Sequence, residues 1–190
     1  MELKGSKTEH NLLASFAGES QARNRYTYFA SVAKKAGYEQ IAGIFLETAD
    51  NEKEHAKLFF KFLQGGELEI TATYPAGIIG DTAANLEASA AGEHLEWTKL
   101  YKEAAEVARQ EGFQDVAKTF QEISEVEEQH ELRYRKLLKN MKENSVFKKD
   151  KVVKWKCRNC GYVHEGTEAP KRCPACDHPQ SYFELMAENY

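Results

Sequence analysis

Residues 47–55 read ETADNEKEH and residues 122–130 read EISEVEEQH, and both stretches end in Glu-x-x-His. Residues i and i+3 of a helix lie on the same face, so each copy directs a carboxylate and an imidazole toward one point. His55 and His130 are 75 residues apart (130 − 55). Two such motifs, each preceded by a helix that carries another glutamate, are typical of a carboxylate-bridged pair of metal ions inside a four-helix bundle.

The segment 6–143 is predicted to be helical with short breaks. Ser6 and Glu9 have the spacing of a capping box, which favours a helix start there. The glycines at 37 and 112 indicate short turns, whereas the long segment 67–80, which contains Pro75, can cross from one end of a bundle to the other. This pattern predicts a mainly α, ferritin-like bundle with one long crossover. The expected helices are residues 6–37, 39–63, 81–111 and 114–141.

The two halves of this region resemble each other. Ala17-Gly18-Glu19 matches Ala91-Gly92-Glu93 at an offset of 74 residues (93 − 19), whereas Glu52 and His55 match Glu127 and His130 at 75. The change of one residue in the offset falls within the first helix of each pair or at its end. An internal duplication of this kind places similar ligands around a pseudo-symmetric metal pair.

Side chains of two types, carboxylate and imidazole, make up the candidate ligand set. Buried carboxylates without a counter-charge are prohibitively costly, and two divalent ions remove that objection. Carboxylate and imidazole ligands suit iron or manganese. The candidate ligands are Glu19, Glu52, His55, Glu93, Glu96, Glu127 and His130.

Glu96 breaks the symmetry of the repeat. It follows Glu93 by three residues, but Ala22 stands at the matching position after Glu19. The second half therefore supplies an extra carboxylate, and the two metal positions cannot be equivalent. A diferric pair carries two more positive charges than a diferrous pair, so we expect Glu96 to favour the oxidised state.

Several polar residues near these motifs have two interpretations. Tyr26 and Tyr101 fall on roughly the ligand face, where they either pack in the core or donate hydrogen bonds to metal-bound carboxylates. We expect His94 on the surface or beside a ligand. We expect the remaining glutamates of the motif regions to be solvated, namely Glu54, Glu125, Glu128 and Glu131.

All four cysteines lie in the last fifth of the chain, as Cys157-x-x-Cys160 and Cys173-x-x-Cys176. Paired Cys-x-x-Cys spacing predicts a tetrahedral four-thiolate site and leaves zinc or iron open. The Cys-Gly-Tyr and Cys-Pro-x-Cys contexts favour a rubredoxin-type iron site over a structural zinc ribbon. Asp177 stands where rubredoxins usually have glycine. Such a short segment needs metal to fold, because it cannot bury a sufficient core.

The composition narrows the class of protein. The chain has 190 residues, 42% of them hydrophobic, and a net charge of −4. No broad basic surface is expected, which argues against nucleic acid, and no apolar run is long enough for a membrane span or a signal peptide. We therefore expect a cytoplasmic protein. Residues 1–146 are predicted to form the bundle and residues 153–190 the rubredoxin-like domain, with a linker at about 147–152.

In both ligand sets and along almost its whole length, the chain resembles rubrerythrin. The resemblance implies that Glu52 and Glu127 bridge two irons, while Glu19, Glu93 and His130 are terminal ligands. It also implies that Glu96 and His55 exchange at one iron as its oxidation state changes. The four cysteines would bind a single iron, and Tyr26 joins Glu96 and His55 as a candidate catalytic residue.

The resemblance implies reduction of hydrogen peroxide to water, as a defence against oxidative stress in anaerobes. Electrons would come from NAD(P)H through a separate reductase or a rubredoxin, since no Gly-x-Gly-x-x-Gly fingerprint is present. Together with the length of the helices, it implies a head-to-tail homodimer. The alternatives are a ferroxidase or iron-storage protein, which would form cages, and an electron carrier without peroxide turnover.

Overall fold

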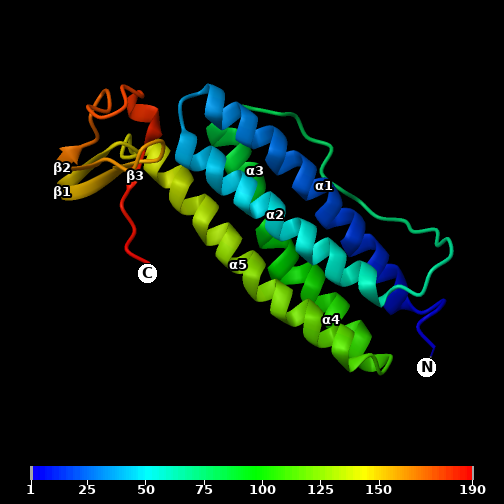
Figure 1. Ribbon diagram of the computed structural model, residues 1–190. Coiled ribbons are helices and arrows are strands. Elements are labelled where there is room, and N and C mark those ends of the chain that lie inside the picture. The colour runs from blue at the N-terminus through cyan, green and yellow to red at the C-terminus, as the bar shows by residue number, and fades with distance from the viewer. Residues whose placement is uncertain (1, 190) are drawn as a thin grey trace.

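The computed structural model describes residues 2–189 as a helical bundle followed by a small sheet (Figure 1). A π-helical segment, η1 (Glu96–Leu100), joins α3 to α4, so these three elements occupy the place of the predicted third helix. The predicted bundle with one long crossover is confirmed. Its helices are α1 (Lys7–Lys35), α2 (Glu39–Phe62), α3 (Thr82–Leu95), α4 (Tyr101–Gln110) and α5 (Gln114–Lys142).

The helix ends follow from local sequence. The Ser6 hydroxyl accepts the backbone N–H of Glu9 at 3.0 Å, as the capping-box pattern predicts, although the Glu9 carboxylate accepts from Gly5 at 2.6 Å. The Asp81 carboxylate caps α3 by accepting the N–H of Ala84 at 2.8 Å. Gly112 follows α4 with a φ of 90°, a left-handed conformation that glycine adopts without a steric penalty. These residues therefore separate the helices.

Two hydrophobic clusters fill the bundle on either side of its middle. Burial of this apolar surface is the main stabilising term of the bundle, at about 25 cal/mol per Å². The cluster nearer the sheet includes Tyr26, Phe29, Ile41, Phe45, Tyr134 and Leu137. The cluster nearer the N-terminus includes Leu3, Leu12, Phe59, Tyr101, Val116 and Phe120. The polar residues of the Glu-x-x-His motifs lie between the two.

The crossover, residues 63–81, has no helix or strand and runs along the outside of α1 (Figure 1). The Tyr74 hydroxyl donates to the carbonyl of Ala14 on α1 at 2.6 Å. Near the other end, the Asn85 side chain forms two hydrogen bonds with the backbone of Gly80, at 2.9 and 3.0 Å. The crossover is thus held against α1 and α3.

The tail forms a three-stranded antiparallel sheet in the order β2-β1-β3. Its strands are β1 (Lys148–Cys157), β2 (Val163–Glu168) and β3 (Phe183–Leu185), with a 3₁₀ turn, η2 (Gln180–Tyr182), before β3. Trp155, Phe183 and two of the cysteines are buried together. Residues 148–152, expected within the linker, form the first half of β1, and its pairing with β2 is irregular between Lys148 and Val153. The domain division itself stays a prediction.

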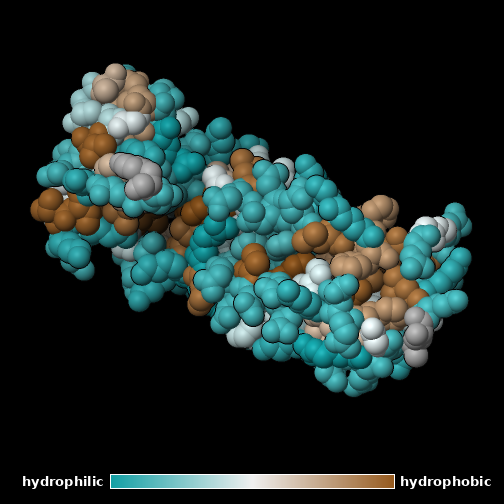
Figure 2. Space-filling view, turned by 60° about the horizontal axis from the view of Figure 1, so that its bottom comes forward, coloured by the Kyte–Doolittle hydropathy of each residue, from teal (hydrophilic) through white to brown (hydrophobic). Residues whose placement is uncertain are grey.

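The sheet rests against the end of the bundle where α1 turns into α2 (Figure 1). Tyr38 stacks on Phe147 with ring centroids 6.1 Å apart. A Cβ at Gly43 would lie 2.6 Å from a guanidinium nitrogen of Arg158, so the glycine makes room for that side chain. Hydrophilic residues cover most of the face drawn in Figure 2. Within residues 2–189, we find no helix both long and apolar enough to cross a membrane.

Glu111 links the C-terminal end of α4 to the start of α1. Its carboxylate accepts the N–H groups of Lys7 and Thr8 and the Thr8 hydroxyl, at 2.6–3.1 Å. The Thr8 hydroxyl and these backbone groups lower the pKa of Glu111. Because the folded pKa is depressed, the stabilisation is present above the unfolded value of about 4.3 and is lost as the pH falls through the folded value.

We expect Glu111→Gln to lower the melting temperature at pH 7 by about 3–5 °C, because charge-assisted hydrogen bonds at the start of α1 are lost. Below pH 4 the difference from the unmodified protein should shrink. Calorimetry at both pH values measures this difference. Glu87→Gln, an exposed change on α3, is the control. Equal melting temperatures for the Glu111 variant and the unmodified protein at pH 7 would contradict the role of Glu111.

Candidate metal centres

Six of the seven predicted ligands of the bundle converge at its middle. They form two groups in which one ligand atom per residue lies within 4.8 Å of the others. Glu52 and Glu127 belong to both groups, so their carboxylates lie between the two positions. The first group is Glu19, Glu52, His55 and Glu127, and the second is Glu52, Glu93, Glu127 and His130.

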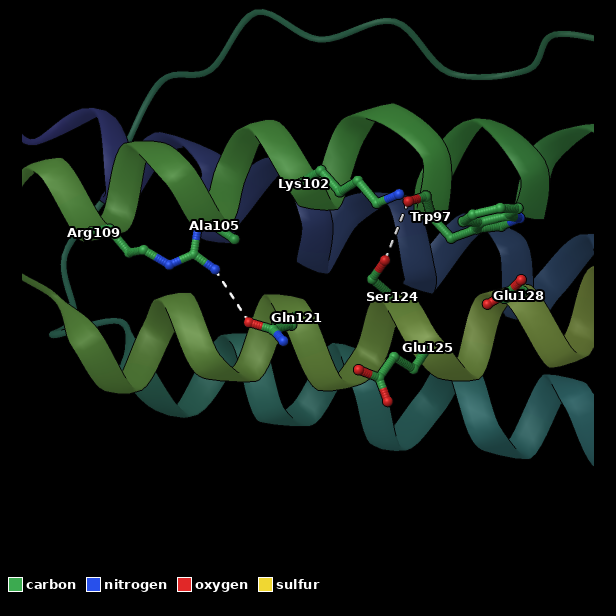
Figure 3. A pocket seen from close by; sticks show the side chains of 8 residues that line it. All are labelled: Trp97, Lys102, Ala105, Arg109, Gln121, Ser124, Glu125 and Glu128. Carbon is green, nitrogen blue, oxygen red and sulfur yellow. Dashed lines mark hydrogen bonds between the residues drawn. The ribbon is translucent and has the colours of Figure 1, made fainter.

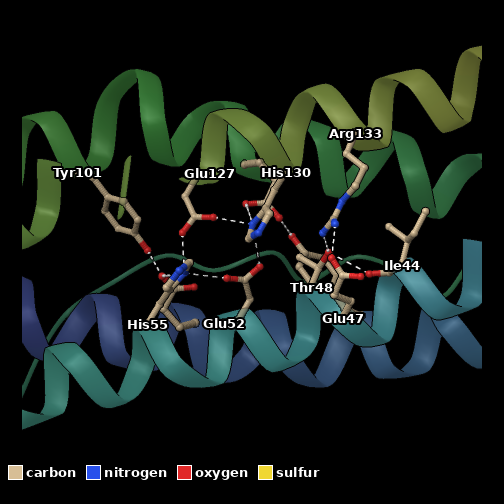
Figure 4. A network of polar contacts seen from close by, with 12 residues as sticks. Ile44, Glu47, Thr48, Glu52, His55, Tyr101, Glu127, His130 and Arg133 are labelled. Atoms are coloured by element: carbon tan, nitrogen blue, oxygen red, sulfur yellow. Dashed lines mark hydrogen bonds and ion pairs between the residues drawn. The ribbon is translucent and has the colours of Figure 1, made fainter. Parts of the chain in front are cut away.

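The distances show how the two shared carboxylates divide their oxygens (Figure 4). The Nδ1 atom of His55 lies 2.9 Å from Oε1 of Glu127 and 3.0 Å from Oε2 of Glu52. The Nδ1 atom of His130 lies 2.8 Å from Oε2 of Glu127 and 3.3 Å from Oε1 of Glu52. Each shared carboxylate thus offers one oxygen to each position, which is the arrangement of a bridging ligand.

These atoms fit metal ions better than they fit one another. Both oxygens of Glu52 and Glu127, and Nδ1 of both histidines, are buried without a hydrogen bond of acceptable geometry. Buried polar atoms normally have partners, and six orphaned atoms at one point would be very costly. Cations bound among them would satisfy all six atoms, and carboxylate and imidazole ligands suit iron. The residues therefore fit a pair of iron ions.

The pKa shifts of the buried groups also favour bound cations. Burial and the neighbouring carboxylates raise the pKa of Glu19 and Glu93 well above the ordinary value. Burial lowers the pKa of His55, but its contacts with Glu127 and Glu52 outweigh this effect and raise it to about 10. Without metal, the cluster therefore holds protons to limit its negative charge. Bound cations would replace those protons.

Two tyrosines hold Glu19 and Glu93, which each belong to one ligand group, in a crossed arrangement. The hydroxyl of Tyr101 on α4 donates to Oε1 of Glu19 on α1 at 2.5 Å. Conversely, Tyr26 on α1 donates to Oε1 of Glu93 on α3. Burial and nearby carboxylates raise the pKa of both hydroxyls well above the ordinary value, so they stay protonated donors. Of the two interpretations of these tyrosines, hydrogen bonding to candidate ligands is present, and both rings also pack in the core.

The π-helix accounts for the change of offset in the repeat. Glu19 and Glu93 are 74 residues apart (93 − 19), whereas Tyr26 and Tyr101 are 75 apart (101 − 26). The extra residue lies between Glu93 and Tyr101, where η1 widens the helix. One inserted residue converts an α-helical turn into a π-bulge, a feature frequent at functional sites. The π-helical segment that accommodates the extra residue begins at Glu96.

Glu96 stands apart from the other six candidates. It belongs to neither ligand group. Burial and the negative charges of Glu127 and Glu52 raise its pKa to about 8, although Arg25 opposes the shift. The Glu96 carboxylate therefore lies close enough to Glu52 and Glu127 to feel their charge, although it is outside both ligand groups. Its role as a ligand stays a prediction.

Glu131 was expected to be solvated, and this expectation is wrong: it is 5% exposed. Its carboxylate accepts from the indole N–H of Trp97 and the guanidinium of Arg135, both at 2.5 Å. His94 lies 3.0 Å from the Glu131 carboxylate, and its side chain is 51% exposed, which agrees with the surface alternative expected for it. Because Trp97 belongs to η1, Glu131 anchors the π-helix to α5. Helical spacing could not show this, since the widened turn changes which face Trp97 occupies.

Arg133 is a second residue that the sequence did not indicate. Its guanidinium donates to Glu47 at 2.5 Å and to the Thr48 hydroxyl at 2.6 Å, which links α5 to α2 one turn from the ligands (Figure 4). Glu47 had a counterpart in the repeat, Glu122, but nothing in the pattern paired it with an arginine. The link holds together the two helices that carry the Glu-x-x-His motifs.

The four cysteines converge in the tail, as predicted. Sγ of Cys157 lies 3.8 Å from that of Cys176, and Sγ of Cys160 lies 3.6 Å from that of Cys173. A disulfide requires about 2.05 Å, whereas sulfurs about 2.3 Å from one ion at tetrahedral angles lie about 3.8 Å apart. The four thiols therefore fit one tetrahedral ion.

Each Cys-x-x-Cys turn, or knuckle, is followed by a residue with a left-handed backbone conformation. Gly161 has a φ of 81°, and Asp177 has a φ of 60°. Aspartate tolerates this conformation better than most residues, and Arg172 holds its carboxylate at 2.7 Å. The backbone N–H of His178 lowers the pKa of Cys176 to about 6. The absence of glycine at 177 therefore leaves the second knuckle intact.

Comparison with known proteins agrees with this geometry. A family model described as Rubrerythrin matches residues 10–138, and one described as Rubrerythrin, rubredoxin-like domain, matches residues 155–184. The chain is 63% identical to a rubrerythrin of Porphyromonas gingivalis, over 99% of this chain and 94% of that protein. It is 59% identical to a rubrerythrin of Nitratidesulfovibrio vulgaris, over 99% and 98%.

A solved structure has the same fold. Fully reduced, all-ferrous nigerythrin matches with a TM-score of 0.64 and 31% identity, covering 96% of this chain and 87% of that one. A bacterioferritin of Desulfovibrio desulfuricans shares the ferritin-like fold, with 22% identity and a TM-score of 0.64. That match covers 73% of this chain and 82% of that one.

We expect removal of metal to lower the melting temperature by about 5–10 °C, because ions at 100 times their dissociation constant contribute about 2.7 kcal/mol. Calorimetry of chelated and Fe(II)-loaded protein measures the shift. In the double variant Glu52→Gln, Glu127→Gln the tail site is unchanged, so any remaining shift belongs to the cysteines. A shift of equal size in the double variant and the unmodified protein would show that the bundle holds no ions.

Proposed function

Because this chain belongs to the rubrerythrin family, we propose that it is a peroxidase that reduces hydrogen peroxide to water, as a defence against oxidative stress in anaerobes. As a member of that family it is an oxidoreductase with a di-iron carboxylate site and a rubredoxin-like four-cysteine site. One observation carries the proposal. Two shared carboxylates, Glu52 and Glu127, lie between two ligand groups whose orphaned atoms are buried between hydrophobic clusters.

We assign the ligands from these groups. Glu52 and Glu127 would bridge the ions, and Glu93 and His130 would complete one position. Glu19 and His55 would complete the other, where Glu96 and His55 are the side chains that we propose to exchange. The placement of Glu96 outside both groups, on a widened helical turn beside Glu93, supports this assignment. The four cysteines would hold the third iron.

When bound, a reduced iron pair supplies the two electrons that cleave the O–O bond of peroxide. The protein contributes the geometry around it. Tyr26 and Tyr101 remain protonated and donate to Glu93 and Glu19. We therefore propose that both are positioning residues, in place of the catalytic role expected for Tyr26. The two hydrophobic clusters exclude water from both ends of the site. Bound cations would favour the charged forms of Glu19 and Glu93, whose pKa values burial and the neighbouring carboxylates raise.

We propose that the four-cysteine site returns electrons to the bundle, and that a rubredoxin or an NAD(P)H-dependent reductase supplies them. The cytoplasm, where thiols stay reduced, suits four free cysteines. From His130 to the end of α5 at Lys142 is about 18 Å at 1.5 Å per residue, and the tail begins beyond that end. This separation supports a head-to-tail homodimer, in which one tail lies beside the partner's iron pair.

Two rivals remain testable. A ferroxidase or storage protein would load iron and prefer oxygen, and an electron carrier would not consume peroxide. The four-cysteine tail favours an electron-supplied peroxidase over storage. Rapid mixing of reduced, iron-loaded protein with peroxide or with oxygen separates all three, since only the peroxidase is oxidised faster by peroxide.

We expect Glu96→Ala to keep the fold and to slow peroxide reduction at least tenfold, because the oxidised ion pair loses a carboxylate. Rapid-mixing absorbance measures the rate, and circular dichroism measures the fold. Glu122→Ala on the exposed face of α5 is the matched control. Equal rates in the Glu96 variant and the control would contradict the role of Glu96.

We expect Cys160→Ser to leave single-turnover oxidation by peroxide intact and to abolish turnover with an external donor. The tail would no longer pass electrons to the bundle. Steady-state donor oxidation measures this loss. Normal steady-state rates would show that the tail is structural.

Mixing this variant with Glu52→Ala chains tests the dimer. In a head-to-tail dimer, an intact tail on one chain serves an intact bundle on the other, so exchange of subunits should restore turnover. If each tail serves its own bundle, the mixture stays inactive.

A further inference from the structure

Gly18 and Gly92, the repeated glycines of Ala-Gly-Glu, have no packing role. Among the described residues, a Cβ at Gly92 would meet no neighbour within 4 Å, and one at Gly18 would meet only a ring carbon of Tyr74, at 3.6 Å. Neither glycine has a positive φ. Glycine inside a helix costs about 1 kcal/mol relative to alanine. Two glycines at matching positions therefore need another explanation.

Both glycines line one cavity of about 570 Å³. It lies between α1 on one side and α3, η1 and α4 on the other, and the crossover residues 72–75 form its roof. Tyr74 fixes the roof by its hydrogen bond to Ala14. Each missing side chain thus enlarges the cavity from one of the two facing walls.

One end of the cavity borders the candidate di-iron site. Glu96 and Tyr101 both line it, and Tyr101 donates to the carboxylate of Glu19. A second cavity, of about 420 Å³, lies between α4 and α5 (Figure 3). Charged side chains such as Lys102, Arg109 and Glu128 line it, and it includes none of the proposed ligands. Of these two cavities, only the first is therefore lined by a proposed ligand, Glu96.

Hydrogen peroxide alone does not explain this volume. A water molecule occupies about 30 Å³ of liquid, and peroxide is only about twice as large. Most of the surface that lines the cavity is apolar, and Glu96, Tyr101 and Arg25 form a polar end. Other polar side chains also line it, namely Asn11, Ser15, Gln21, Thr73, Lys99 and Glu103. This lining suits a molecule with a polar head and an apolar body. The hydrocarbon walls include Ala14, Ala72, Pro75, Leu95, Leu100 and Val107.

We propose that this cavity binds small organic hydroperoxides, with the hydroperoxide group at the Glu96 and Tyr101 end and the hydrocarbon body under the crossover. This inference rests on the proposed function. In the reaction ROOH + 2 H⁺ + 2 e⁻ → ROH + H₂O, the O–O bond breaks, one oxygen leaves as water and the other stays in the alcohol. The reduced metal pair supplies both electrons, and solvent supplies the protons.

Binding of the product alcohol tests the cavity without turnover. Calorimetric titration of the full-length, iron-loaded protein with cumyl alcohol should show one site per chain. Gly92→Leu, which fills the cavity from α3, should weaken that binding at least tenfold. Ala91→Leu, one residue earlier on the exposed face, should leave it unchanged. No binding to the unmodified protein, or equal binding to the Gly92 variant, would overturn the proposal.

Turnover provides the second readout. The unmodified protein should reduce both cumene hydroperoxide and hydrogen peroxide. Gly92→Leu should lower kcat/KM for cumene hydroperoxide at least tenfold more than for hydrogen peroxide. Equal losses for both substrates would place the effect at the metal site and overturn the proposal.

The two failures are distinguishable. Reduction of hydrogen peroxide without cumene hydroperoxide would sink this inference alone, and reduction of neither would sink the proposed function. The measurements on the unmodified protein decide the matter if the Gly92 variant does not fold.

Discussion

Mutual repulsion among buried carboxylates is the constraint on which the rest of this structure depends. Glu19, Glu52, Glu93 and Glu127 are each at most 1% exposed, and all lie at the middle of one bundle. Such a cluster is stable only with cations or protons among its oxygens. The hydrophobic clusters on either side stabilise the helices strongly enough to hold the carboxylates together. The bundle is therefore a scaffold that keeps like charges close until cations neutralise them.

The duplicated sequence explains both the symmetry and its exception. Each half supplies a terminal glutamate, a Glu-x-x-His pair and a tyrosine, and the halves meet across the ions. A single inserted residue in the second half produces the π-helix and places Glu96 at the edge of the cluster. Trp97 and Glu131 then fix this widened turn to α5. The asymmetry on which the proposed ligand exchange depends thus arises from one residue and is held in place by one buried carboxylate.

Much of the fold and of the candidate site could be predicted because it depends on local periodicity. The spacing of Glu52 and His55 places both on one helical face, and Gly112 ends a helix through its own backbone. Glu131 was misplaced because its burial depends on Trp97, whose direction changes in the π-helix. Arg133 and the cavity escaped prediction because they arise from contacts between distant segments. Residue spacing carries no information about such contacts, or about a space that glycines leave empty.

The crossed tyrosines have a consequence for how the ions enter. Tyr26 belongs to the helix that carries Glu19 but holds Glu93, and Tyr101 continues the helix that carries Glu93 but holds Glu19. Any sliding of α1 relative to α3 and α4 would therefore disturb both terminal carboxylates together. The crossed hydrogen bonds thus couple the two ligand groups, so occupancy of one position would favour the geometry of the other.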